Sequence, residues 1–495
     1  AERANAAYTL QPAGYVALAG DATLANGRVA ELQIEGWAND RWFADIQDAV
    51  DRHDNVVITR NRQWTGITIN RDDVTILGIN NPKLLYQSAT GNHVTIGDDL
   101  ADIRRVTICG IWFAQSVFKT ADAAIRVNRG IGIKLKNLNI TDSYDGVYVN
   151  GIARSEFTDI WFNYDFGRAG VAANKCFSLN ANASGMEVVN LKMTRCDGVH
   201  AHGLGTFIHI TTSDWIDITQ CHANLADYFL HIEHGASNLR QVWVTDCYMD
   251  QAYKSNVLID GAGGGVCDGI KFTSNYFRAA ADDGITIDGT GSINSIAIQG
   301  NNRFQQSDKL AINCTNEAVV NLIVRDAIFT SDIGTANTYP VIQASAIRNT
   351  IESCSFIENN ALVDIQASRT TTSGYVRLVD NDFNASSSAT RATNNNFLVA
   401  KYAGNFGLVD FPPTQNSDSA QAIITTDGSG LAVITHGLPF TPTYIDVSLR
   451  ALNSEVAKVN GAPTTTTFNI YLYEGTTGAA LANATRTVFW NAFSG

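Results

Sequence analysis

Carboxylates and imidazoles recur at a fixed spacing in the middle of the chain. Glu233, Asp260 and Asp288 are 27 and 28 residues apart, and each follows a short apolar run. Six of the nine histidines lie between residues 200 and 234. Carboxyl groups that stand side by side repel one another, which raises the pKa of at least one, and an acid paired with an ionised carboxylate is what glycoside cleavage needs. We therefore predict a catalytic set of Glu233, Asp260, Asp288, His231 and His202, in which a histidine orients an acid or moves a proton. The expected outward row reads Asn150, His202, Glu233, Asp260 and Asp288, and the neighbouring row reads Tyr148, His200, His231, Leu258 and Thr286.

Other interpretations of these polar residues stay open. They are also what a solvated strand presents to water. His200, His202, His231 and Glu233 offer nitrogen and oxygen atoms that suit a metal ion, although our prediction is that the chain holds no metal and no cofactor. A second acidic row is expected on an earlier strand, formed by Glu156, Glu187 and Asp217 and continued by Trp243.

Aromatic residues are expected to face outward beside these rows. The predicted carbohydrate-binding residues are His200, Trp215, Trp243, Tyr248 and Tyr276, because an aromatic ring offers apolar area with a polar edge to a sugar. One expected outward row reads Trp161, Lys192, His222, Tyr248 and Tyr276. Its alternative role is to pack against another copy of the chain, since exposed aromatic rows indicate some partner.

These rows depend on an internal repeat that stacks residues about 27 apart. The segments 216–223, 242–249 and 270–277 share the order apolar, x, apolar, x, turn-former, Cys or Asn, x, apolar. We name the Cys or Asn position the anchor. A two-part unit at a near-constant period is typical of a stacked solenoid. The expected anchors are Ile111, Leu138, Ile160, Leu191, Cys221, Cys247, Asn275, Asn301, Ala327, Cys354 and Asn381, each preceded by a turn position that favours the left-handed conformation.

Ile270–Phe277 matches the pattern I-x-I-x-x-N-x-F, and the repeat resembles the right-handed parallel β-helix of the pectate-lyase type over roughly residues 45–410. The resemblance implies an all-β fold with about 27 residues per coil. It is specific for the fold and weak for the function. Cysteine anchors face the interior and are expected to be reduced thiols.

Composition excludes some classes of partner. The chain has 495 residues and a formal net charge of −13, so we expect no nucleic-acid partner. No stretch of about 18 apolar residues is present, which predicts no membrane insertion.

The composition changes at both ends of the repeat. We predict an N-terminal linker or adaptor (1–40), a β-helix (41–410) that begins with a short capping helix near residues 42–50, and a small C-terminal β-sandwich (411–495) for trimerisation or glycan binding. The run G-S-G-L-A-V-I-T-H-G-L in the C-terminal segment resembles small modules of bacteriophage tail proteins.

Taken together, this organisation resembles a bacteriophage tailspike. The resemblance implies a homotrimer, attached through its N-terminus to the phage baseplate or tail, folded in the host cytoplasm and carried in the virion. It implies binding of a bacterial surface polysaccharide and its depolymerisation, with glycoside hydrolysis as the expected reaction. The alternatives are a polysaccharide lyase acting on uronate or alginate, a spike that binds glycan without cutting it, and a secreted bacterial enzyme of similar fold.

Overall fold

The computed structural model divides into two compact units, Ala1–Thr286 and Ile287–Gly495. It describes the chain except residues 1–6, 11–21, 24–28, 34–36, 44, 118, 165–173, 182–184, 200–204, 236, 262–264, 331–337, 359–360, 371–373, 387–389, 396, 398, 404, 406–416, 436–440, 443, 450–454, 465, 475–476, 478 and 494–495. The fold is an all-β parallel solenoid of about 27 residues per turn, with 58% of residues in strands and 2% in helices. The predicted all-β parallel β-helix is confirmed.

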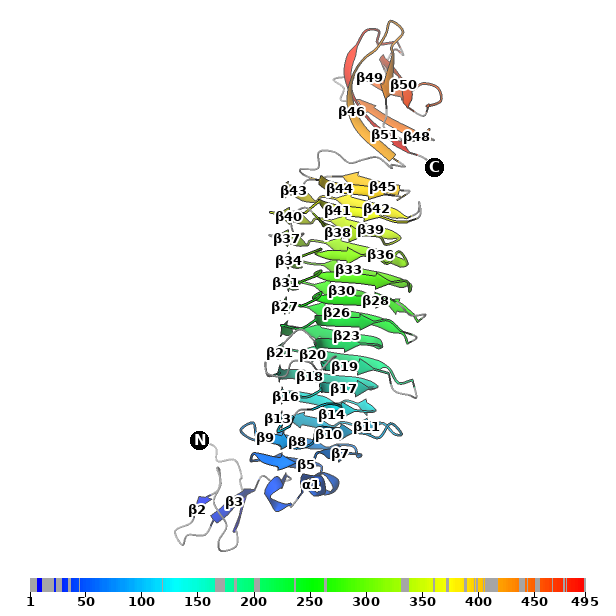
Figure 1. The fold of residues 1–495 in the computed structure, drawn as a ribbon. Coiled ribbons are helices and arrows are strands. Elements are labelled where there is room, and N and C mark those ends of the chain that lie inside the picture. The colour runs from blue at the N-terminus through cyan, green and yellow to red at the C-terminus, as the bar shows by residue number, and fades with distance from the viewer. Residues whose placement is uncertain are drawn as a thin grey trace. The chain divides into compact units, whose positions relative to one another are not determined.

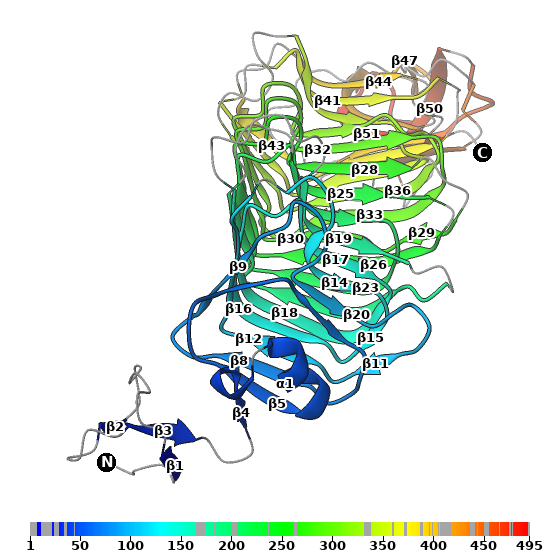
Figure 2. The same cartoon turned by 60° about the horizontal axis from the view of Figure 1, so that its bottom comes forward.

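In the first unit the solenoid has three faces, each a ladder of parallel strands in register (Figure 1, Figure 2). Face 1 consists of β7 Ile67–Ile69, β10 Val94–Ile96, β14 Ala123–Val127, β17 Asp145–Asn150, β19 Asn174–Asn180, β22 Gly205–Ile210, β25 Tyr228–Glu233 and β28 Val257–Gly261. Face 2 consists of β5 Asn55–Ile58, β8 Thr75–Gly78, β11 Ile103–Arg104, β12 Thr107–Cys109, β15 Gly130–Ile131, β16 Lys134–Thr141, β18 Ile152–Asn163, β20 Val188–Thr194, β23 Ser213–Thr219, β26 Leu239–Thr245, β29 Cys267–Asp268 and β30 Ile270–Thr273. Face 3 consists of β6 Arg62–Trp64, β9 Lys83–Tyr86, β13 Trp112–Gln115, the ends of β16 and β18, β21 Asp197–Val199, β24 His222–Asn224, β27 Tyr248–Asp250 and β31 Tyr276–Arg278.

Left-handed residues turn the chain from face 2 to face 3. The residue before the anchor has positive φ, as the turn-former pattern predicted: Gly110 71°, Asn137 49°, Asp159 54°, Gln220 54°, Asp246 53° and Ser274 55° in the first unit, and Asn301 59°, Asp326 53°, Ser353 54° and Asp380 54° in the second. The repeat therefore fixes this corner of the coil through the backbone conformation of one residue per turn.

Two predicted anchors are wrong. Arg303 pairs with Ile328, which follows the anchor Ala327, and Asn302 is buried while Asn301 is exposed, so the anchor of that coil is Asn302, not Asn301. Trp161 pairs with Asp197 and Asp197 with His222, so the anchor between Ile160 and Cys221 is Cys196, not Leu191. Leu191 instead pairs with Ile216, within face 2.

Buried polar side chains link successive coils at the anchors. Cys221 N donates to Cys247 Sγ at 3.4 Å, which confirms the predicted stacking of these two cysteines. Cys247 N donates to Asn275 Oδ1 and Asn275 Nδ2 donates to Val244 O, both at 2.9 Å. All eight cysteines are free thiols, and burial raises the pKa of Cys267 to about 12.

A short helix lies at the start of the coils. α1 Ile46–Arg52 follows β4 Ala38–Asn39 and the 3-10 helix η1 Asp40–Trp42. The Gln47 side-chain amide accepts from Thr68 N at 2.7 Å and donates to Thr68 O at 2.8 Å, on β7, which is the end strand of its sheet in the described part of the chain. Before β4, the strands β1 Ala7–Leu10, β2 Ala22–Thr23 and β3 Val29–Gln33 form a separate antiparallel sheet.

The second unit continues the repeat. Its strands are β32 Ile285–Gly289 (which begins in the first unit), β33 Ile293–Gln299, β34 Arg303–Gln305, β35 Ile312–Cys314, β36 Val319–Arg325, β37 Ile328–Thr330, β38 Pro340–Ala344, β39 Arg348–Glu352, β40 Ser355–Ile357, β41 Val363–Ser368, β42 Tyr375–Val379, β43 Asp382–Ala385, β44 Thr390–Asn395 and β45 Val399–Ala403. The buried rings of Phe304, Phe329, Phe356 and Phe383 stack at centroid spacings of 5.0, 4.9 and 4.8 Å.

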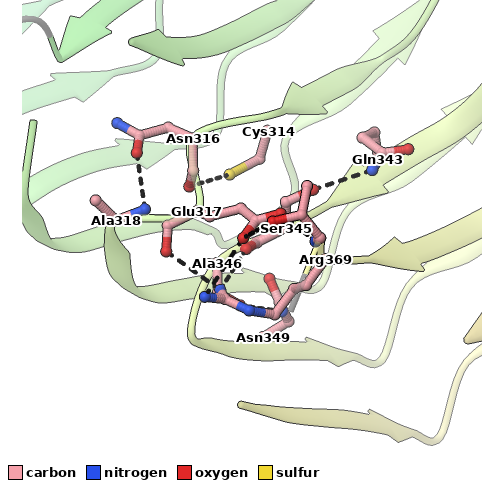
Figure 3. Close-up of polar contacts among 10 residues, drawn as sticks. Cys314, Asn316, Glu317, Ala318, Gln343, Ser345, Ala346, Asn349 and Arg369 are labelled. Atoms are coloured by element: carbon pink, nitrogen blue, oxygen red, sulfur yellow. Dashed lines mark hydrogen bonds and ion pairs between the residues drawn. The ribbon is translucent and has the colours of Figure 1, made fainter. Parts of the chain in front are cut away.

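A buried arginine joins three loops of this unit (Figure 3). Arg369 Nη1 donates to Ser345 O at 2.6 Å and to Glu317 O at 3.2 Å, while the Glu317 carboxylate accepts from the hydroxyl of Thr370 at 3.0 Å. The charge is paired and hydrogen-bonded, which is what a buried guanidinium requires. We interpret this cluster as structural.

The C-terminal strands form two antiparallel sheets. β46 Ser417–Thr425, β51 Thr485–Phe493 and β48 Tyr444–Leu449 form one, and β47 Leu431–Thr435, β50 Thr467–Glu474 and β49 Glu455–Val459 form the other. Phe468, Ile470, Val488 and Trp490 are buried between them. None of the helices in the described part of the chain has the length and hydropathy to span a membrane.

Candidate functional site

Two carboxylates lie on neighbouring strands of face 1. β25 and β28 pair in parallel with Glu233 opposite Asp260 and His231 opposite Leu258. Leu230, Ile232, Val257 and Ile259 are fully buried, so the alternate side chains of both strands point outward. The predicted stacking of Glu233 on Asp260 is therefore present in the structure. Neighbouring strands lie about 4.8 Å apart, close to the carboxyl separation of retaining glycosidases.

A buried histidine holds Glu233. His209 on β22 lies opposite His231, is only 4% exposed, and places its Nε2 2.9 Å from Glu233 Oε2. Its other ring nitrogen, Nδ1, lies 3.0 Å from Lys175 Nζ. An ammonium can only donate, so Nδ1 accepts, and the ring proton is on Nε2 and is donated to Glu233. Lys175 thereby fixes the tautomer whose N–H is donated to Glu233 Oε2.

The two histidines are neutral at physiological pH. Burial lowers the pKa of His209 to about 4, helped by the charge of Lys175 and by His231 and opposed by Glu233. Burial also lowers the pKa of His231, against the carboxylates of Glu233 and Asp260. The two rings are 4.9 Å apart, and within the described residues His231 Nε2 is buried without a hydrogen-bond partner.

A third carboxyl group lies on an earlier strand of the same face. Asp145 on β17 pairs with Lys175 on β19, and its Oδ1 accepts from Lys175 N at 3.2 Å. Burial raises the pKa of Asp145 to about 6, although the Lys175 backbone N–H and side-chain charge oppose the rise. Asp145 is three strands from Glu233, so it is no direct partner of that carboxylate.

Sequence reasoning missed His209, Lys175 and Asp145. A signal for His209 was present: Phe207-Ile-His-Ile210 repeats the pattern of Phe229-Leu-His-Ile232 on the next strand. No comparable pattern marked Lys175 or Asp145.

The predicted histidine positions in the column need correction. The outward column through Glu233 contains Asn150, Asn180 and Thr211, and the neighbouring column contains Tyr148, Ser178 and His209. His202 and His200 were expected at the places that Thr211 and His209 occupy, and both lie outside the described residues. Asp288 belongs to the second unit, where its Oδ1 accepts from Thr315 Oγ1 at 3.2 Å and from Gly289 N at 2.7 Å. Its role in catalysis stays a prediction.

The second acidic row is wrong as drawn. Glu156 pairs with Lys192 and Lys192 with Asp217, so lysine takes the place predicted for Glu187. The column on face 2 reads Lys134, Glu156, Lys192, Asp217, Trp243 and Lys271. Lys136 binds Glu156 at 2.9 Å and lowers its pKa. Alternating charges neutralise this row, and no pair of carboxylates stands side by side in it.

The predicted aromatic residues do not surround the acids. Trp215 and Trp243 lie on face 2 with ring centroids 5.1 Å apart, and Tyr248 and Tyr276 stack on face 3 at 5.1 Å. In the face 3 row Asp197, not Lys192, follows Trp161, and its carboxylate lies 2.8 Å from His222 Nδ1.

Metal ligands do not converge in the part of the chain that the structure describes. No group of three or more His, Cys, Asp or Glu side chains there has the arrangement to hold a metal ion.

No family model and no curated protein sequence matches this chain. Among solved structures, a mutant tailspike protein of E. coli bacteriophage HK620 in complex with a pentasaccharide matches with a TM-score of 0.50 at 12% identity, over 92% of this chain and 85% of that one. The Dettilon tailspike protein matches with a TM-score of 0.37 at 10% identity, over 92% of both chains. The tailspike of Pseudomonas phage phi297 matches with a TM-score of 0.35 at 11% identity, over 91% of both chains. The chain thus has the parallel β-helix fold of the HK620 tailspike.

Proposed function

We propose that this protein is a phage tailspike that binds a bacterial surface polysaccharide and hydrolyses its glycosidic bonds at Glu233 and Asp260. The observation that carries the proposal is the Glu233 carboxylate, bound by the neutral His209 and paired in register with Asp260. The fold shared with a tailspike that is described in complex with a pentasaccharide supports the substrate class.

The two carboxyl groups have different roles in this proposal. The N–H of His209 donates to Glu233 Oε2 and orients the carboxylate, which suits a nucleophile that attacks the anomeric carbon. Asp260 donates a proton to the leaving glycosidic oxygen. In the second step Asp260 takes a proton from water, the water oxygen attacks the anomeric carbon, and Glu233 is released. The stereochemistry at the anomeric carbon is retained.

Elimination is the second candidate, and a specific observation favours it. His231 is neutral, lies beside the acids in the neighbouring outward row, and in the described structure its buried Nε2 has no hydrogen-bond partner, so a ring that turns outward could take a proton from a uronate. The proton next to the carboxylate would pass to His231 and the glycosidic oxygen would leave, giving an unsaturated uronate.

The test is to incubate the protein with surface polysaccharide of its bacterial host and to analyse the products. New reducing ends without an unsaturated uronate support hydrolysis, and an unsaturated uronate selects the lyase. Binding without fragments would show a non-catalytic spike.

Glu233→Gln and Asp260→Asn should each reduce cleavage at least 100-fold, whereas Asp246→Asn, which changes an exposed carboxylate at a left-handed corner, should not. Asp288→Asn tests whether that carboxylate contributes. Full activity in both the Glu233 and Asp260 variants would refute the assignment.

Assembly and location belong to the same proposal. Three chains would associate side by side, the N-terminus would join the baseplate or tail, and the protein would be carried in the virion tail. Mass photometry of the purified protein tests the trimer.

A further inference from the structure

A pocket lies on face 3, away from the acidic pair on face 1. It has a volume of about 380 Å³, within the range of about 300–1,000 Å³ that small-molecule sites occupy. Its lining is formed by Asn81, Trp112, Asn139, Ile140, Thr141, Trp161 and Asn163. No charged side chain belongs to this lining.

Two tryptophans flank a small residue in this pocket. Trp112 on β13 pairs with Asn139 on β16, and Asn139 pairs with Trp161 on β18, so the two indoles stand two strands apart. Two strand spacings amount to about 9.5 Å. A flat ring in contact with an aromatic face on each side needs about 7–8 Å, twice the usual carbon–carbon contact distance. The gap above Asn139 is therefore wide enough for one sugar ring.

Within the described residues, a hydrogen bond holds the Trp112 ring and none holds the Trp161 ring. Trp112 Nε1 donates to Thr141 Oγ1 at 2.7 Å, and Lys83 Nζ lies 4.4 Å from the centre of the Trp112 ring. Trp161 is 53% exposed, the largest exposure among the tryptophans of the described residues. A large exposed apolar ring beside a fixed one offers a surface on which a ligand ring can stack.

The polar groups of the pocket suit hydroxyls. In the described structure the side-chain amides of Asn139 and Asn163 make no hydrogen bond within the protein, and each offers both a donor and an acceptor. An aromatic face takes the C–H side of a pyranose while amides take its rim. The lack of charge in the lining favours a neutral sugar over a uronate.

We propose that this pocket is a separate, non-catalytic binding site for a neutral pyranose ring, flanked by Trp112 and Trp161. The proposal rests on the proposed function only for the source of the sugar, a polysaccharide of the bacterial surface. The pocket holds a residue of the glycan on a different face from the cleaving acids, so a bound chain stays attached after the acids have cut elsewhere.

The test uses the full chain and a panel of methyl glycosides of glucose, galactose, mannose and rhamnose, with methyl glucuronide as the charged comparison. Saturation transfer from the protein is expected to at least one neutral glycoside and more weakly to the glucuronide. Trp161→Ala should weaken that binding at least tenfold, and Trp161→Phe, which keeps a ring, should retain most of it. Glu233→Gln should abolish cleavage and leave this binding unchanged, which separates the pocket from the catalytic proposal.

Three outcomes would overturn the proposal. No saturation transfer to any neutral glycoside would show that the pocket takes no sugar. Binding that survives Trp161→Ala would place the sugar elsewhere. A change of oligomeric state in Trp161→Ala, seen by mass photometry, would show that the indole packs against a second copy of the chain.

Discussion

Asn275 provides the sharpest test of how the coils are held together. Its side chain is buried, and it satisfies Cys247 N and Val244 O, each at 2.9 Å. Asn275→Ala would leave one buried backbone donor and one acceptor without partners, at about 1–3 kcal/mol each. We therefore expect a loss of about 2–6 kcal/mol of folding stability.

The matched control comes from the same interior column. Cys221 occupies the equivalent position, and its thiol makes weak sulfur contacts with Met193 O at 3.9 Å, with Thr219 O at 3.5 Å and with the backbone N–H of Cys196. Cys221→Ala should cost about 1–2 kcal/mol, since it removes one buried group of methylene size and a weak sulfur acceptor. Asn275→Asp keeps the acceptor for Cys247 N but sets a carboxylate against Val244 O, so it should be as damaging as alanine at neutral pH and less so in acid.

The assay is the unfolding rate in guanidinium chloride, followed by tryptophan fluorescence, because stacked solenoids can unfold irreversibly. If the contact is lost before the transition state, a loss of about 2–6 kcal/mol raises the rate by roughly 30-fold to 10⁴-fold. The reasoning is refuted if Asn275→Ala unfolds no faster than Cys221→Ala.

Three further predictions concern the first unit. His209→Ala should reduce the initial rate of cleavage by about 10- to 200-fold, because one hydrogen bond to a charged group is lost. His209→Gln can still accept from Lys175 and donate to Glu233, so it should retain most of the activity. Equal rates in both variants would contradict a role for the contacts that link Lys175, His209 and Glu233. The folded-state pKa of Asp145 (about 6) is above its ordinary value of 3.8, so its contribution to stability is present below about pH 4 and lost as the pH rises through 6. Asp145→Asn should therefore gain roughly 3 kcal/mol over the parent at pH 8 and little at pH 4 in unfolding experiments, and an equal gain at both pH values would exclude this cause. Gly146→Ala should abolish soluble expression or lower the melting temperature sharply, because the new Cβ would lie 2.1 Å from the Phe162 ring and 2.5 Å from Cys176 O. An unchanged melting temperature would mean that the backbone of this coil shifts to make room for the methyl group.

The repeat was predictable where the coils have equal lengths. Gln220 and Asp246 are 26 residues apart, and Asp246 and Ser274 are 28 apart, so the alternation rule placed Glu233 beside Asp260 correctly. The coil that ends at Arg195 is longer, because Asp159 and Arg195 are 36 residues apart, whereas Arg195 and Gln220 are 25 apart. The extra residues shift every position of this coil relative to a constant period of 27, and His202 was therefore expected where Thr211 lies.

The anchor misplaced at Leu191 has a second physical cause. Some coils of the first unit contain, besides the left-handed residue before the anchor, another one inside the face 2 strand, such as Arg154, Asn190 and Gln241. Asn190 has φ 52° and Arg195 has φ 51°, but only Arg195 precedes an anchor. Asparagine is the expected residue for this conformation and arginine is not, so composition favoured the wrong position. The contact of Lys175 with His209 depends on a long side chain that reaches across strands, which no periodicity encodes.

The direction of the backbone hydrogen bonds in the first unit has a mechanical consequence. Parallel strands in register direct these bonds along the stacking axis, from one coil to the next. Tension along that axis loads the coils in series, so the weakest one yields first and the rest can peel away from it. Compression instead presses close-packed interiors together, and these resist being squeezed. Such a column is suited to pushing against a surface rather than to bearing a pull.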